Sequence, residues 1–149
     1  METIQELYQE IIIDHSNCPR NEGDIENPTH IAEGYNATCG DEVTVSVLVK
    51  NGIVSDIKFR AQGCSISRAS GSMLTEKIRG MSFGEALKFS KNLQKMLSSD
   101  PSATFDENEM GDLVALLGVK QFPMRIKCAT LAWHTFENAL KNIAKDIEY

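Results

Sequence analysis

The chain has 149 residues, of which 42% are hydrophobic and 24% are charged, and its formal net charge at pH 7 is −6. This composition is typical of globular proteins and excludes a wholly disordered chain, and the negative charge argues against nucleic acid as the main partner. No apolar run reaches the ~20 residues of a membrane helix, and the first residues lack the basic and apolar regions of a signal peptide. We therefore expect a single domain over residues 1–149, located in the cytoplasm and not bound to a membrane.

The first part of the chain predicts one helix followed by a small antiparallel sheet. Thr3 and Glu6 have the spacing of a capping box, and apolar residues then recur on one helical stripe. Residues 14–28 are polar, contain helix breakers and predict a loop, and a strand is expected at about 31–36. From 42 to 60 the apolar residues alternate around an Asn51-Gly52 turn, which predicts a hairpin. The residues expected to share one face of it are Val43, Val45, Val47 and Val49, then Ile53, Ser55, Ile57 and Phe59.

The remainder of the chain predicts helices. They are expected at about 65–79, 82–97 and 109–117, with Gly80 and Gly118 ending the first and the third, and a polar loop lies between the second and the third. A last helix begins near Pro123, and its apolar stripe consists of Leu131, Ala132, Phe136, Ala139, Leu140, Ile143 and Ile147. A helix, an antiparallel sheet and then a helical half indicate an α+β fold: a small antiparallel three-stranded sheet packed against helices.

The four cysteines are the residues most able to carry chemistry, although a buried apolar role is the ordinary one for each alone. Cys39 precedes Gly40 and Asp41 in a loop before a strand. Cys64 follows a glycine at a helix start, where the positive helix end favours a thiolate. Cys128 lies in the first turns of the last helix, and Cys18 lies among polar residues and receives no task. Three thiols and one carboxylate would complete a tetrahedral metal site, whereas His15, His30 and His134 have no spacing typical of one.

Three segments of the chain resemble the IscU/SufU family of iron–sulfur assembly proteins. They are Ala37-Thr38-Cys39-Gly40-Asp41, Gln62-Gly63-Cys64-Ser65-Ile66-Ser67-Arg68-Ala69-Ser70 and Arg125-Ile126-Lys127-Cys128-Ala129-Thr130-Leu131-Ala132-Trp133. The resemblance is greater to the SufU branch, because Lys127 stands where IscU proteins have a histidine and 63 residues separate Cys64 from Cys128. Gln121-Phe122-Pro123-Met124-Arg125 also replaces the chaperone-recognition motif of IscU.

The resemblance implies a metal site formed by Cys39, Asp41, Cys64 and Cys128, with Cys39 as the persulfide acceptor. It implies that the protein binds Zn²⁺ and takes sulfur from a SufS-type PLP-dependent cysteine desulfurase. In that role it is a sulfur-transfer partner in the SUF system rather than a stand-alone enzyme. The alternative is a scaffold that assembles a transient [2Fe–2S] cluster on the same ligands and passes it to other SUF assembly proteins or to apo-protein recipients.

Two further hypotheses come from the residues themselves. A thiol redox enzyme that uses Cys39 or Cys64 needs a resolving cysteine, and the sequence shows no close pair. In a purely structural zinc domain, the exposed loop position of Cys39 would have no purpose. Arg125 and Lys127 are expected to offset the negative charge of the site or to form a docking patch, although both fit a plain surface role too.

Overall fold

A computed structural model of the chain describes residues 4–98, 110–141 and 147–148. The chain folds in the order α, β, β, β, α, α, 3₁₀, α, β, which confirms the expected α+β class. The elements are α1 (Ile4–Asn17), β1 (His30–Asn36), β2 (Asp41–Lys50), β3 (Ile53–Gln62), α2 (Ser65–Ile78), α3 (Phe83–Leu97), the 3₁₀ helix η1 (Gly111–Gln121), α5 (Pro123–Leu140) and β4 (Ile147–Glu148).

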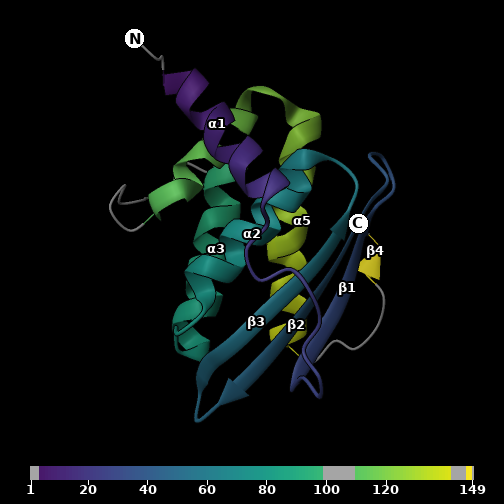
Figure 1. Cartoon of the computed structure of the whole chain (residues 1–149), viewed down its shortest axis with the longest axis vertical. Coiled ribbons are helices and arrows are strands. Elements are labelled where there is room, and N and C mark those ends of the chain that lie inside the picture. Colours follow the sequence, from purple (N-terminus) through teal and green to yellow (C-terminus); the bar gives the residue numbers. More distant parts are fainter. Residues whose placement is uncertain (1–3, 99–109, 142–146, 149) are drawn as a thin grey trace.

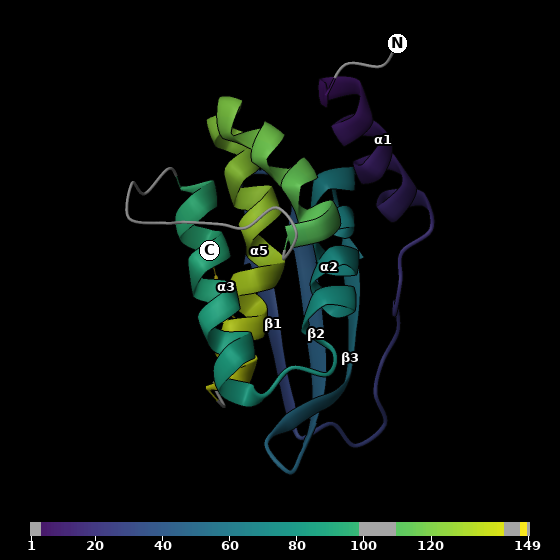
Figure 2. The same cartoon turned by 90° about the vertical axis from the view of Figure 1, so that its left-hand side faces the viewer.

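The sheet has the strand order β3-β2-β1-β4, and α2 and α5 pack against one of its faces (Figure 1, Figure 2). The three long strands are antiparallel as expected. The two-residue β4 adds a parallel pairing to β1 that the sequence did not predict. Ile147 was expected on the stripe of the last helix, and this expectation was wrong because α5 ends at Leu140 and Ile147 pairs with Gly34. Ile143 lies outside the described residues.

The β2–β3 hairpin turns at Asn51 and Gly52, whose φ angles of 52° and 75° are those required by the predicted two-residue turn. The expected faces of β3 were only partly right. Ile57 and Phe59 are buried, but Val54 is buried in place of Ile53 and Ser55. The cause is a register shift opposite Leu48 and Val49, which leaves Ser55 without a residue across from it and resets the alternation.

The helix boundaries differ from the predictions at two places. Helix α1 extends to Asn17, and so includes four residues that were assigned to the polar loop. The helix expected at 109–117 is a 3₁₀ helix that begins at Gly111 and passes through Gly118 to Gln121. Gly80, at a φ of +93°, follows the end of α2 as expected. The loop predicted before η1 lies at residues 99–109, outside the described part of the chain.

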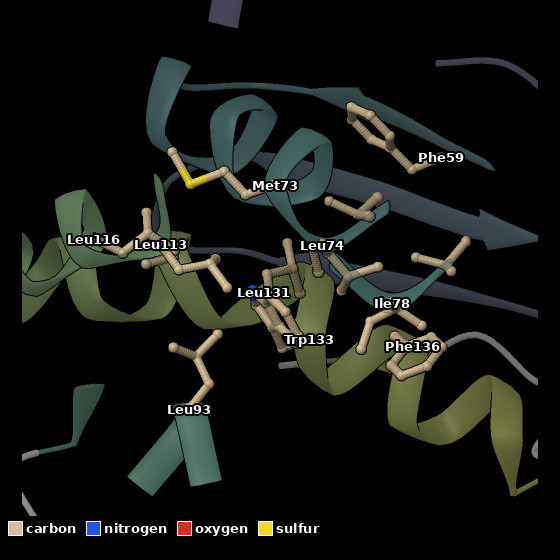
Figure 3. Packing of buried hydrophobic residues seen from close by; sticks show 14 of the residues in the cluster. Phe59, Met73, Leu74, Ile78, Leu93, Leu113, Leu116, Leu131, Trp133 and Phe136 are labelled. Carbon is tan, nitrogen blue, oxygen red and sulfur yellow. The ribbon is translucent and has the colours of Figure 1, made fainter. Parts of the chain in front are cut away.

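A core of large apolar side chains joins α2 and α5 to the sheet (Figure 3). Phe59 of β3 packs on Gly71 of α2 so closely that a Cβ there would lie 2.6 Å from the ring. Between the helices, the buried Trp133 indole donates a hydrogen bond of 3.0 Å to Ser70 Oγ, and Ser70 in turn donates to the carbonyl of Ala129. These contacts fix α2 and α5 relative to each other. No helix in the described ranges is long and apolar enough to cross a membrane.

Candidate metal centre

Cys39 lies in the short loop that joins β1 to β2. The loop is closed by the pair Asn36 and Asp41, which are directly opposite each other in the two strands. The Gly40 amide donates a 2.8 Å hydrogen bond to the Asn36 carbonyl, and Gly40 has a φ of +70°, a conformation that suits glycine. This tight turn leaves the Cys39 side chain partly exposed at one end of the sheet.

Asp41, the first residue of β2, is fully buried and is bound to the start of α2. Its Oδ1 accepts a 2.8 Å hydrogen bond from the Cys64 backbone N–H, and its Oδ2 lies 3.7 Å from the Cys64 thiol. Gly63 makes this approach possible, because a Cβ at that position would lie 2.9 Å from the Asp41 Cα and would overlap the carboxylate. Since Cys64 is the N-cap of α2, the carboxylate also lies near the positive end of the helix.

Cys128 approaches the same place from α5. Its side chain is fully buried, and its Sγ lies 3.3 Å from Cys39 Sγ and 3.8 Å from the Met124 carbonyl oxygen. Burial raises the pKa of the Cys128 thiol, and its contacts with Cys39, Asp41 and Cys64 raise it further. The metal-free site therefore holds Cys128 as a neutral thiol, and a metal ion that bound there would have to displace its proton.

Together these elements place one ligand atom each of Cys39, Asp41 and Cys128 within 4.8 Å of one another. Cys64 joins the group through its two contacts with Asp41. Three sulfurs and one carboxylate oxygen are a donor set that suits Zn²⁺, which binds thiolate and carboxylate ligands tetrahedrally. The structure thus brings together the four residues that the sequence singled out, although they lie up to 89 positions apart.

The rim of this cluster is formed by the first turns of α5. Phe122 and Met124 expose 59% and 65% of their surface, which is unusual for large apolar side chains. Arg125 and Lys127 are exposed in the same segment. A partner that reaches the cluster from this side would meet both apolar and positively charged groups.

The remaining cysteine and one histidine also have defined positions. Cys18, which lies among polar residues in the sequence, is exposed. His15 is fully buried, with Nδ1 at 2.8 Å from Ser72 Oγ and Nε2 at 3.0 Å from Asp112 Oδ2. His15, Glu76 and Asp112 form a second group of side chains that could bind a metal ion. The sequence did not indicate this group, because the three residues belong to three different elements. Since both ring nitrogens have partners, His15 links α1 to α2 and η1.

Cys39 and Cys128 also form a close pair of thiols. The sequence itself shows no close pair of cysteines, although the metal site implied by the family resemblance requires these two to meet, and in the structure their sulfur atoms are in contact. This pair therefore supplies the neighbouring thiol that a redox reaction of Cys39 would need. Nothing in the spacing of 89 residues could have shown it, because β1 and α5 become neighbours only in the folded chain.

The fold is a layered α+β domain, and three cysteines and one aspartate cluster at one end of its sheet. These features define a class of small proteins with a thiol-rich metal site. The chain belongs to the family described as the NifU-like N-terminal domain, whose model matches residues 7–143. It is thus a member of the SufU/IscU group of iron–sulfur cluster assembly proteins, as its three cysteine segments suggested.

The relatives within this family carry two kinds of name. The chain is 41% identical over 141 residues to the zinc-dependent sulfurtransferase SufU of Bacillus subtilis, covering 94% of this chain and 91% of that protein. It is 37% identical over 139 residues to the iron–sulfur cluster assembly scaffold protein IscU of Thermotoga maritima, covering 93% and 96%. The solved structure of FiSufU from Fervidobacterium islandicum AW-1 superposes with a TM-score of 0.82 at 40% identity, covering 93% of this chain and 99% of that one.

Proposed function

We propose that this protein is a zinc-dependent sulfur acceptor that takes persulfide sulfur from a SufS-type PLP-dependent cysteine desulfurase. The observation that carries the proposal is the convergence of Cys39, Asp41 and Cys128 within 4.8 Å, with Cys64 bound to Asp41. The similarity to a protein named zinc-dependent sulfurtransferase supports it. The free cysteines fit a reducing compartment, and we place the protein in the cytoplasm.

Cys39, Asp41, Cys64 and Cys128 are the proposed zinc ligands. When bound, zinc would keep the thiols deprotonated at neutral pH and so keep them nucleophilic. Four protein ligands form a closed site, so a sulfur acceptor has to leave the metal before it reacts. Cys39 is best placed to do so, because it lies in a loop at the end of the sheet and is partly exposed, whereas Cys128 is fully buried. Cys64 is partly exposed too, but it is the N-cap of α2 and its N–H is bound to Asp41.

The transfer step is an exchange between a thiolate and a persulfide. The Cys39 thiolate attacks the outer sulfur of the persulfide on the desulfurase, and a new S–S bond forms on Cys39. The S–S bond of the desulfurase persulfide breaks, and its cysteine leaves as a thiolate with the bonding electron pair. The step needs no external oxidant or reductant, because one persulfide replaces another.

A second candidate function uses the same ligands. The similarity to a protein named IscU scaffold favours a role in which iron and sulfide are assembled into a [2Fe–2S] cluster and passed to recipients. Lys127, in place of the histidine typical of IscU proteins, inclines us to the sulfur acceptor. The two roles differ in what the four ligands hold: zinc in the sulfur acceptor, and an iron–sulfur cluster in the scaffold.

Metal content and sulfur transfer test the proposal directly. The purified protein should carry about one zinc per chain. Cys64→Ser and Cys128→Ser should lose it, while Cys18→Ser, which changes the exposed thiol, should retain it. After incubation with the desulfurase and cysteine, mass spectrometry should find an added sulfur on Cys39. Full zinc content in the Cys64→Ser and Cys128→Ser variants would refute the ligand set, and sulfur found only on another cysteine would reassign the acceptor.

An Asp41→Ala variant separates the two candidate functions. Carboxylate is a harder ligand than thiolate and should be the more exchangeable position. In the sulfur acceptor, its loss should weaken zinc binding and lower desulfurase stimulation, and anaerobic reconstitution with iron and sulfide should give little stable visible absorption. A long-lived cluster on Asp41→Ala that transfers poorly to recipients would favour the scaffold instead.

A further inference from the structure

Two buried polar atoms in the described ranges have no hydrogen-bond partner: Asn36 Nδ2 and Ser67 Oγ. Both residues are fully buried. Buried polar groups in folded proteins are almost always paired, so each exception needs a physical reason. Both atoms belong to the segments that carry the candidate metal centre. This shared location suggests that the same cause leaves both atoms without a partner.

Asn36 lies beside the Cys39 loop. It is the last residue of β1 and is directly opposite Asp41 in the hairpin. Its Oδ1 accepts a 3.2 Å hydrogen bond from the Thr38 N–H, so that oxygen is used and only the amide donor is left. Asn36 shares the buried face of β1 with Gly34, which packs against Leu131 of α5, three residues beyond Cys128. The unused donor is therefore on the side of the strand that faces α5.

Ser67 lies in the first turn of α2, three residues after Cys64. It is also three residues before Ser70, whose hydroxyl donates to the carbonyl of Ala129, the residue after Cys128. Residues three apart lie on the same side of a helix, so Ser67 shares the face of α2 that packs on α5. Its hydroxyl is thus held between the segments that carry Cys64 and Cys128, without a partner of its own.

We infer that Asn36 and Ser67 are positioning residues that donate hydrogen bonds to the sulfur ligands of the metal-loaded site. The inference rests on the proposed metal site. A neutral thiol is a weak acceptor, whereas a metal-bound cysteine is a thiolate and accepts hydrogen bonds well. Three thiolates, one carboxylate and Zn²⁺ sum to a charge of −2 in a largely buried place, and donors aimed at sulfur spread that charge. Without metal, neither donor has a sulfur in hydrogen-bonding position; metal binding draws the ligand thiolates together and brings a sulfur within reach of each donor.

Ser67→Ala should not destabilise the protein without metal, but it should weaken the binding of zinc. Without metal, the substitution removes a hydroxyl that has no partner, so the midpoint of thermal unfolding should stay the same or rise. With zinc, it removes a donor to a ligand, so the affinity measured by chelator competition should fall by about tenfold or more. With Co²⁺ in place of zinc, the sulfur-to-metal charge-transfer band should move to longer wavelength, because a thiolate without its hydrogen bond gives up electron density more easily.

Ser90→Ala is the matched control. Ser90 is equally buried, but it lies on α3, and its hydroxyl donates to the Trp133 carbonyl and accepts from Gln94. This variant should unfold at a lower temperature with or without metal and leave the zinc affinity and the cobalt spectrum unchanged. Asn36→Asp, which keeps the acceptor for the Thr38 N–H and replaces the donor by an oxygen, should weaken zinc binding as well.

The outcomes separate this inference from the proposed function. If the wild-type chain takes up no zinc, the proposed metal site is wrong. If the wild-type chain binds zinc but Ser67→Ala binds it equally well, the inference fails while the site stands. A Ser67→Ala variant that is less stable without metal, with unchanged affinity and cobalt spectrum, would show that Ser67 has only a packing role.

Discussion

Gly63→Ala tests the geometry that brings Asp41 to the start of α2. Gly63 has a φ of +128°, and a Cβ there would lie 2.9 Å from the Asp41 Cα. Alanine would therefore both adopt an unfavourable backbone conformation and displace the carboxylate from the Cys64 N–H, to which it is bound at 2.8 Å. We expect a loss of stability and a loss of zinc together.

Gly80→Ala separates these two effects. Gly80 also has a positive φ, of +93°, but a Cβ there would meet nothing within 4 Å. The backbone term, roughly 1–2 kcal/mol for an L residue, is expected in both variants. Only Gly63→Ala should also lose a hydrogen bond to a charged acceptor, which contributes about 1.5–3 kcal/mol. For a chain of this size, that difference should place the unfolding midpoint of Gly63→Ala about 3–12 °C below that of Gly80→Ala.

Thermal unfolding of both metal-free variants, followed by zinc titration, is the assay. Gly80→Ala should bind zinc like the wild type, and Gly63→Ala should bind less than one equivalent. Equal unfolding midpoints and full zinc binding in both variants would refute the argument, because the Asp41 carboxylate would then have tolerated a methyl group in its own place.

Three further predictions follow from other contacts. After removal of metal and mild oxidation, Cys39 and Cys128, whose sulfurs are 3.3 Å apart, should form a disulfide that mass spectrometry detects and that Cys128→Ser abolishes. Cys18→Ser should leave sulfur transfer from the desulfurase unchanged, because Cys18 is exposed and is absent from the described metal-ligand clusters; a large loss would show that the wrong cysteine was set aside. The hydrogen bond from Arg20 to Asp14, 2.6 Å long, and the charge of Arg20 lower the pKa of Asp14. The Arg20–Asp14 ion pair therefore stabilises the fold above the ordinary carboxyl pKa, and this contribution is lost as the pH falls through the lowered pKa of Asp14. Between about pH 7 and about pH 3, Asp14→Asn should therefore lose slightly less stability than the wild type.

Local signals predicted most of the sheet and the four α-helices. Asn51-Gly52 requires positive φ at both residues, and the structure has the hairpin there. The bulge at Ser55 has no such signal, because it arises from how β2 and β3 pair, and the faces of Ile53 and Val54 were therefore assigned wrongly. Apolar spacing also could not tell the 3₁₀ helix η1 from an α-helix, or show that Ile147 leaves the helical stripe for the sheet.

The four candidate ligands were implied by the resemblance of three cysteine segments to the IscU/SufU family, while the geometry between them could not be predicted. Glycine before Cys64 and after Cys39 marked both as boundary positions. However, the bond from the Cys64 N–H to Asp41 and the contact of Cys39 with Cys128 depend on packing between distant segments. The unpaired Asn36 and Ser67 have no sequence signal, because an unsatisfied donor becomes visible only when the whole surroundings of the atom are known.

The ligands of the candidate centre are spread over the chain from position 39 to position 128, and this has a consequence for biosynthesis. Cys39, Asp41 and Cys64 belong to the hairpin and the start of α2, but Cys128 reaches them only when α5 has packed on β1, with Leu131 and Thr135 against Gly34. A nascent chain that has not yet emerged beyond α5 lacks the fourth ligand. In the proposed sulfur acceptor, zinc would therefore bind only after α5 has folded, and a chain truncated or misfolded at its C-terminal end would be unable to form the complete site.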